Sequence, residues 1–128
     1  MKRNFMAILM ISIMAVPVIA SASDAELLLD ACKLATGDIN GTKENLVEAA
    51  VDVGFCFGYI RGLSDYSTGT ESMTSEEIKP FQSCRPRGVN NKQLARIVVN
   101  FLERNPQHLH REMTMLVSVA LQEVYPCR

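Results

Sequence analysis

Four cysteines, Cys32, Cys56, Cys84 and Cys127, are the residues of this chain whose chemistry depends most clearly on spacing. They form no C-x-x-C pair, whereas structural zinc sites take their ligands in close pairs that turn around the ion. We therefore predict two disulfides and no metal. Four cysteines allow three connectivities, and the sequence does not choose among them. We prefer Cys56 with Cys84, tying a long central loop to a helix, and Cys32 with Cys127, tying the first helix to the tail.

Side chains that could act as catalysts do not form a recognisable site. His108 and His110 are two residues apart, which turns them about 200° from each other on a helix, so they cannot share a metal ion. Glu48 and Asp52 have i, i+4 spacing, but such a pair is more typical of a solvated helix face. The sequence contains no H-E-x-x-H, G-x-S-x-G or phosphate-loop motif. We predict a binding protein without cofactor rather than an enzyme.

The N-terminus has the composition of a secretory signal peptide. Lys2 and Arg3 precede an apolar stretch over 5–19, and Ala20-Ser21-Ala22 fits the small-x-small cleavage rule. The apolar stretch is shorter than the roughly 20 residues of a membrane-spanning helix, which argues against the alternative of a retained anchor. We predict cleavage after about Ala22, leaving residues 23–128 as one domain without a membrane segment in the periplasm, where disulfides form.

Charge and size limit the partners of this domain. The chain has 13 Lys plus Arg and 14 Asp plus Glu, and loss of the leader leaves 11 basic residues, so the mature net charge is near −3. This balance disfavours nucleic acid or an anionic membrane as the main partner. A domain this small has little core, and disulfides of about 3 to 4 kcal/mol each would supply much of its stability.

Apolar spacing predicts an all-α domain of about four helices and no strand. A Ser-x-x-Glu capping box opens the first helix at Ser23, and Gly37 ends it. The second should run from near Thr42 to about Asp65. Asn90 should open the third.

Prolines should end or interrupt the remaining helices. Asn105-Pro106 should stop the third helix and start the fourth, with Asn105 as N-cap. Pro126 prevents extension of the fourth helix, and Pro86 acts as a chain breaker in the loop before the third.

Gly54, Gly58 and Gly62 recur at every fourth residue and so share one face of the second helix. Glycine costs about 1 kcal/mol relative to alanine at each such site, which calls for a compensating close contact. We favour another helix of the same chain as that contact, with a dimer seam as the alternative. Tyr59 could place its hydroxyl at the surface.

The longest irregular stretch, Tyr66 to Val89, is a candidate contact surface, because loops of this length in compact domains are often functional. A solvated connector without function is the alternative. The side chains that we expect to meet a partner are Ser64, Asp65, Tyr66, Glu71, Glu76 and Glu77. The competing surface is the outer face of the third helix around Lys92, Arg96 and Asn100.

Taken in order, several short motifs resemble one family. They are C-x-G-Y-I-x-G from Cys56, C-x-P-x-x-V from Cys84, Pro106, His110 and the closing Tyr125-Pro126-Cys127. The string resembles the Rap/Tai-type immunity proteins of bacterial type VI secretion, small exported proteins that neutralise peptidoglycan amidase effectors.

This resemblance implies a helical, periplasmic and often dimeric protein that inhibits a cognate amidase by occupying its substrate cleft. Cys32 is a further point of agreement, but the first helix and the 66–81 loop carry no matching motif, so partner specificity is expected to vary there. A periplasmic stress chaperone and a wall hydrolase are the alternatives. Exposure of apolar surface at low pH would identify the former, and digestion of peptidoglycan would identify the latter.

Overall fold

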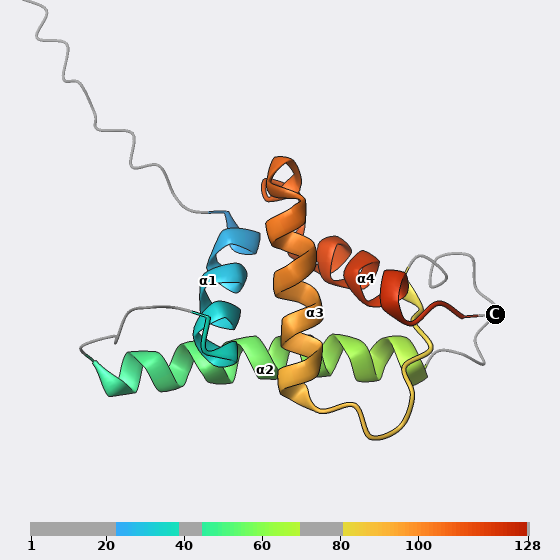
Figure 1. Cartoon of the computed structure of the whole chain (residues 1–128), viewed down its shortest axis with the longest axis horizontal. Coiled ribbons are helices and arrows are strands. Elements are labelled where there is room, and N and C mark those ends of the chain that lie inside the picture. Colours follow the sequence, from blue (N-terminus) through green and yellow to red (C-terminus); the bar gives the residue numbers. More distant parts are fainter. Residues whose placement is uncertain (1–22, 39–44, 70–80, 128) are drawn as a thin grey trace, which may run out of the picture.

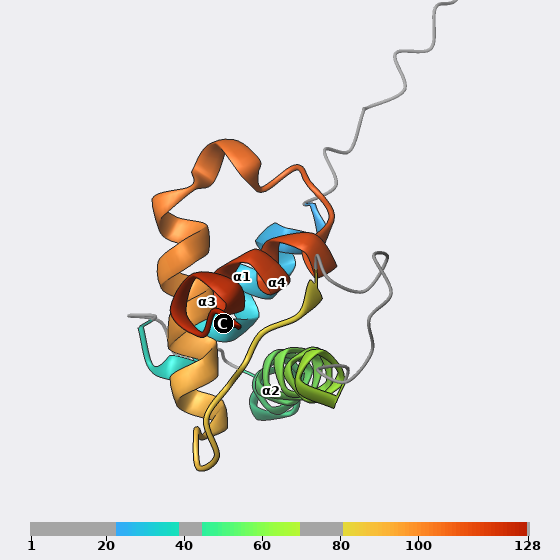
Figure 2. The same cartoon turned by 90° about the vertical axis from the view of Figure 1, so that its right-hand side faces the viewer.

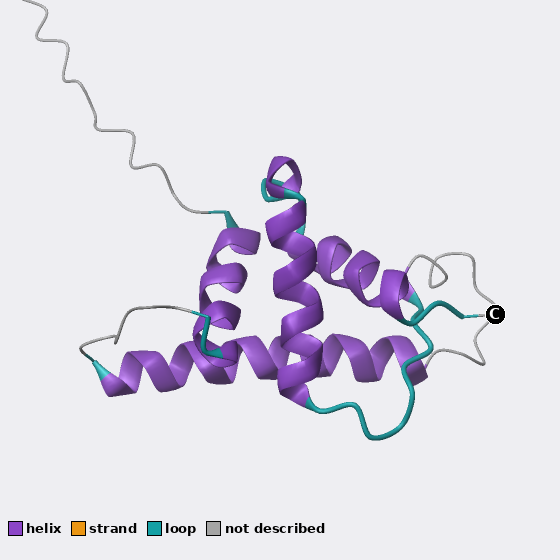
Figure 3. Ribbon diagram, viewed as in Figure 1, coloured by secondary structure: helices purple, strands orange, loops and turns teal. Residues whose placement is uncertain are grey.

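The computed structural model describes residues 23–38, 45–69 and 81–127. These residues form four α-helices: α1 (Asp24–Thr36), α2 (Leu46–Gly69), α3 (Asn91–Arg104) and α4 (Met113–Val124). A short 3-10 helix, η2 (Pro106–His108), connects α3 to α4, and the described part of the chain contains no strand (Figure 3). The prediction of a small all-α domain of four helices with two disulfides is confirmed.

The longest helix, α2, lies across one side of the other three (Figure 1). Figure 2 looks nearly along α2 and shows α1 and α4 together on one side of it. Its buried residues Cys56, Ile60, Ser64 and Ser67 therefore form a single stripe. The opposite side of α2 has no helix over it in either view.

Local sequence signals explain both ends of α1. The hydroxyl of Ser23 accepts a hydrogen bond from the Glu26 N–H, and the Glu26 carboxylate accepts one from the Ser23 N–H, which completes the predicted capping box. At the other end Gly37 has φ 83°, a left-handed conformation that glycine adopts without strain. Apolar residues on the inner face, led by Leu28, are fully buried in the core.

The boundaries of α2 differ from the prediction. The side chain of Asn45 accepts a hydrogen bond from the Val47 N–H (3.0 Å), and the helix begins at Leu46; Thr42 lies outside the described residues. The helix continues past Asp65 to Gly69. The polar residues of this last turn stay within the helix, and the hydroxyls of Ser67 and Thr68 donate to the Ser64 carbonyl.

The start predicted for the fourth helix is wrong. Asn90 caps α3 as expected, its side chain accepting from the Gln93 N–H (2.8 Å). The amide of Asn105, however, donates to the Phe101 carbonyl (2.8 Å) and so completes the end of α3 instead of capping a new helix. Pro106 begins only the short turn η2, and α4 begins at Met113. The end of α4 before Pro126 is as predicted.

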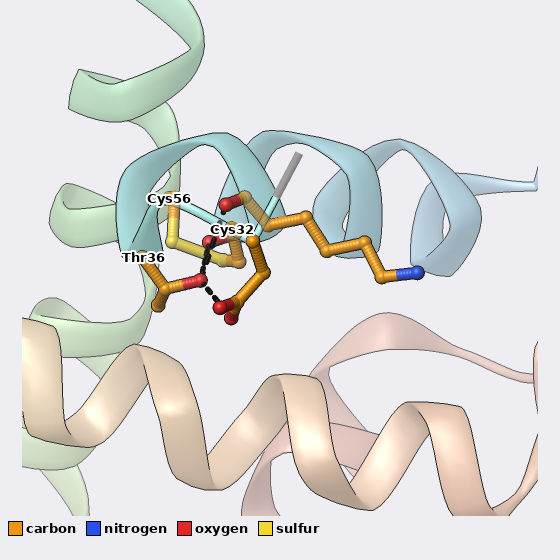
Figure 4. Close-up of a disulfide and its surroundings, with 5 residues drawn as sticks. Cys32, Thr36 and Cys56 are labelled. Carbon is orange, nitrogen blue, oxygen red and sulfur yellow. Dashed lines mark hydrogen bonds between the residues drawn. A yellow bond between two sulfur atoms is a disulfide. The ribbon is translucent and has the colours of Figure 1, made fainter. Parts of the chain in front are cut away.

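The predicted disulfide connectivity is also wrong. Cys32 pairs with Cys56 and Cys84 pairs with Cys127, and no described cysteine is free. The first bond joins α1 to α2 where the two helices cross, with both residues 0% exposed (Figure 4). The second joins the segment before α3 to the C-terminal tail, beside a hydrogen bond from the Cys84 N–H to the Tyr125 carbonyl (2.8 Å).

Candidate interaction surfaces

The glycine-bearing side of α2 faces outward, which contradicts the prediction of close packing within the chain. A methyl group placed on Gly54, Gly58 or Gly62 would meet no atom within 4 Å beyond the neighbouring backbone of α2 itself. Exposed apolar side chains lie on the same side, including Val47 (72% exposed) and Val51 (63% exposed). We call this side, made of Val47, Val51, Gly54, Gly58 and Gly62, the open face of α2.

The end of α2 is fixed to the segment that carries Cys84. The Arg85 guanidinium donates to the Ser64 hydroxyl (2.8 Å) and to the Asp65 carboxylate (2.7 Å). The Asp65 carboxylate also accepts from Arg61 (2.8 Å). Ser64 is 0% exposed and Arg85 is nearly buried, so the prediction that the contact surface begins at Ser64 is wrong. Ser64 and Asp65 position the end of the helix.

Tyr66 remains well exposed, at 55%, and the side chains of Asp65 (50%) and Arg96 (55%) are exposed as well. Tyr66 borders a hollow of about 410 Å³ whose floor includes Gly58 and Gly62. On the other side of the hollow the Tyr59 hydroxyl is 2.9 Å from the Thr114 hydroxyl at the start of α4. Tyr59 is thus half-buried and bridges two helices. The other predicted residues, Glu71, Glu76 and Glu77, lie outside the described residues.

A second hollow, of about 530 Å³, lies on the same flank of α2, nearer the start of that helix. Its apolar part includes Leu27 (53% exposed) from α1 and Phe55 (41% exposed) from α2. Its four carboxylates belong to Asp24, Asp30, Glu48 and Asp52, and none of the described residues that line it is basic. Sequence analysis missed this hollow because it is formed only where α1 meets α2.

The two hollows adjoin one another. Phe55 lines the acidic hollow and Tyr59 lines the glycine-floored one, with their ring centroids 6.0 Å apart. Their neighbours at the start of α4, Met113 and Thr114, are also divided between the two hollows. We call the combined surface the α2 groove.

The competing surface on α3 is also present. Arg96, Lys92 and Asn100 line a shallow depression of about 440 Å³ beside Tyr125. The exposed Arg96 guanidinium donates to the Thr36 carbonyl (3.3 Å) and lies 4.0 Å from the Asp38 carboxylate. This face therefore combines positive charge with exposed amide groups.

Charged groups elsewhere form surface pairs rather than a reactive cluster. The described residues contain no group of three or more His, Cys, Asp or Glu that could hold a metal ion. His108 lies in η2 and His110 in the turn that follows. On α1 the hydrogen bond from Lys33 to Glu103 (2.7 Å) raises the pKa of the lysine, against a smaller opposing effect of desolvation.

The fold and these surfaces define a small disulfide-bonded helical protein whose exposed apolar grooves suit protein binding. None of the helices in the described part of the chain is long and apolar enough to cross a membrane. A family model, described as Rap1a immunity proteins, matches residues 24–127. The chain belongs to this family of immunity proteins, which confirms the resemblance of its motifs. Comparisons with curated proteins and with solved structures gave no match.

Proposed function

We propose that this protein is a periplasmic immunity protein that binds and inhibits a cognate peptidoglycan amidase delivered by type VI secretion. Membership of the Rap1a immunity family, over residues 24–127, is the observation that carries this proposal. An immunity protein protects the producing cell by binding an effector. The two disulfides are consistent with export to an oxidising compartment, and a wall amidase acts in the same compartment.

The architecture suits inhibition by occupation of a cleft. A cleft is blocked most effectively by a surface that is already ordered, because the entropy of ordering then does not oppose binding. Here the Cys84–Cys127 disulfide and the Ser64, Asp65 and Arg85 hydrogen bonds hold the region around Tyr66. We propose that Tyr66 and the segment that follows it enter the amidase cleft, and that the protein does no catalysis of its own.

Co-expression tests the proposed function and its location. A cell that exports a type VI amidase to its periplasm should survive when it also makes the full chain, since both proteins then meet outside the cytoplasm. A variant lacking residues 1–22, the predicted signal peptide, should not protect. Equal protection by the leaderless variant would contradict the periplasmic assignment. Lysis despite verified export of the folded immunity protein would contradict inhibition of that amidase.

Affinity measurements with the purified amidase test the contact surface. Tyr66→Ala should weaken binding by about 2 kcal/mol or more if Tyr66 is a central anchor. Arg96→Glu tests the competing face of α3, and both variants should keep native helicity because both side chains are exposed. Normal binding by Tyr66→Ala together with loss of binding by Arg96→Glu would move the interface to α3.

We further propose that a second copy of the chain packs on the open face of α2, forming a homodimer. Exposed glycines let another helix approach closely, and that approach would offset their cost to α2. Light scattering after gel filtration should give a dimer mass for the parent and a monomer mass for Gly58→Glu. Asn100→Glu, which adds the same charge to α3, is the control and should stay dimeric. The dimer would be refuted if the parent protein stayed monomeric at a concentration about 100 times that used in the binding measurements.

A further inference from the structure

We propose that the α2 groove binds a short effector segment that carries basic side chains at one end and apolar side chains at the other. This inference rests on the proposed function, because it names the kind of effector surface that the immunity protein recognises. It differs from that function in its site. The expected cleft-entering region begins at Tyr66, whereas the α2 groove extends back along the helix to Glu48.

The shape of the groove fits an extended or irregular segment. From Glu48 to Tyr66 the helix rises about 27 Å, which is the length of about eight residues of extended chain. The Phe55 and Tyr59 rings, 6.0 Å apart, lie between the acidic hollow and the glycine-floored hollow. Bound segments gain most where large side chains enter such hollows, and the small floor at Gly58 and Gly62 leaves room for them.

Charge determines the direction of the segment. Four carboxylates from α1 and α2 surround the hollow at one end. Lysine or arginine would find opposite charge there, with Phe55 and Leu27 covering the aliphatic part of its side chain. The other hollow is lined by Gly58, Tyr59, Gly62, Leu63, Tyr66 and Thr114, none of which is charged, and it suits apolar side chains.

The same charges argue against a second copy of this chain as the occupant. The chain has 14 acidic and 13 basic residues and a formal net charge of −1. A twofold axis through the acidic hollow would bring the Glu48 and Asp52 carboxylates of the two copies toward each other, which is unfavourable. The open face of α2 shares Gly58 and Gly62 with the groove, so a second copy packed on that face and a bound effector segment would compete for these two glycines.

The first experiment uses a model peptide and does not depend on the effector. The peptide has about eight residues, the length that spans the groove, with capped ends, lysines in the first half and leucines in the second. On addition of the peptide, amide resonances of residues around Asp52 and Gly58 should shift in NMR spectra. In a second peptide glutamates replace the lysines, and this peptide should not produce the shifts.

Matched variants then identify the groups that bind. The double variant Glu48→Gln/Asp52→Asn should raise the Kd of the peptide roughly tenfold at low salt. At about 0.5 M salt the ratio of variant to parent Kd should be smaller, because salt screens exposed charges. The control Glu103→Gln/Glu123→Gln removes the same charge from α3 and α4 outside the groove, and should change the Kd less than about twofold. Equal effects of the two pairs, or shifts scattered over other surfaces, would overturn the inference.

The amidase forms the second experiment and separates the two proposals. If the groove serves recognition, Glu48→Gln/Asp52→Asn should weaken amidase binding and the Glu103→Gln/Glu123→Gln control should not. Amidase binding that is insensitive to the groove variants would refute the groove while leaving the immunity function intact. A peptide that docks in the groove of a protein that does not bind the amidase would support the groove and refute the proposed target.

Discussion

The two disulfides should contribute to stability in the order opposite to that expected from loop length. They close loops with sequence separations of 24 for Cys32–Cys56 and 43 for Cys84–Cys127. From these separations the chain-entropy relation gives about 3.5 and about 4.0 kcal/mol. On this relation alone, removal of the Cys84–Cys127 bond would be the more costly change.

Burial reverses this order. Cys32 and Cys56 are both 0% exposed, whereas Cys127 is exposed and Cys84 is partly so. Replacing two core cysteines with alanine removes buried sulfur atoms and leaves space, at about 1 kcal/mol for each. The double variant Cys32→Ala/Cys56→Ala should therefore lose about 5 to 6 kcal/mol, against about 4 kcal/mol for Cys84→Ala/Cys127→Ala.

Urea unfolding followed by circular dichroism measures both losses. A second assay covers the case in which the core variant does not fold: the parent is treated with increasing reductant, free thiols are alkylated, and peptides are identified by mass spectrometry. Cys84 and Cys127 should be alkylated first, because solvent reaches them in the folded protein. A larger loss in Cys84→Ala/Cys127→Ala, or earlier alkylation of Cys32 and Cys56, would refute the argument from burial.

Four further predictions concern local features. Gly58→Ala should raise the free energy of unfolding by about 0.5 to 1 kcal/mol, because the added methyl group meets open space within a helix; thermal unfolding at a concentration where the protein is monomeric measures this, and destabilisation would show a close contact after all. Gly88→Ala, at φ 89°, should lose about 1 kcal/mol in the same assay, and an unchanged midpoint would contradict the strain. Ser23→Ala should lower the free energy of unfolding by about 1 to 2 kcal/mol, since Ser23 caps α1 and its hydroxyl also donates to a backbone carbonyl between η2 and α4 (2.7 Å). Urea unfolding at neutral pH measures this decrease. A decrease below about 0.5 kcal/mol would assign no role to the cap. Lys33→Met should lower the free energy of unfolding by up to about 0.5 kcal/mol at neutral pH. Because Glu103 raises the folded pKa of Lys33 above 10.5, this difference should be complete below pH 10.5 and should vanish as the pH rises through the folded pKa. A difference that persists at the highest pH would assign the effect to packing.

The sequence by itself determined the helical class, most helix ends and the presence of two disulfides. Ser23, Gly37 and Asn90 act on the backbone within a few residues of themselves, so their effects do not depend on the rest of the fold. The motifs around Cys56, Cys84 and Cys127 also carried enough information to indicate the immunity family. Asn105 is one exception besides the ends of α2, because its amide can cap either of two adjoining helices and local sequence does not state which.

Only the tertiary structure decided which cysteines meet, which side of α2 is open and where grooves form. Cys32 meets Cys56 because α1 crosses α2 at that point, and the spacing of cysteines contains no crossing angle. Periodicity placed Gly54, Gly58 and Gly62 on one face of α2, but it did not show whether that face packs against another helix or lies open. Likewise, Glu48 and Asp52 were visible as a pair on one helix. Their place in an acidic hollow depends on Asp24 and Asp30 of α1, because a surface shared by two helices exists only after the helices have packed.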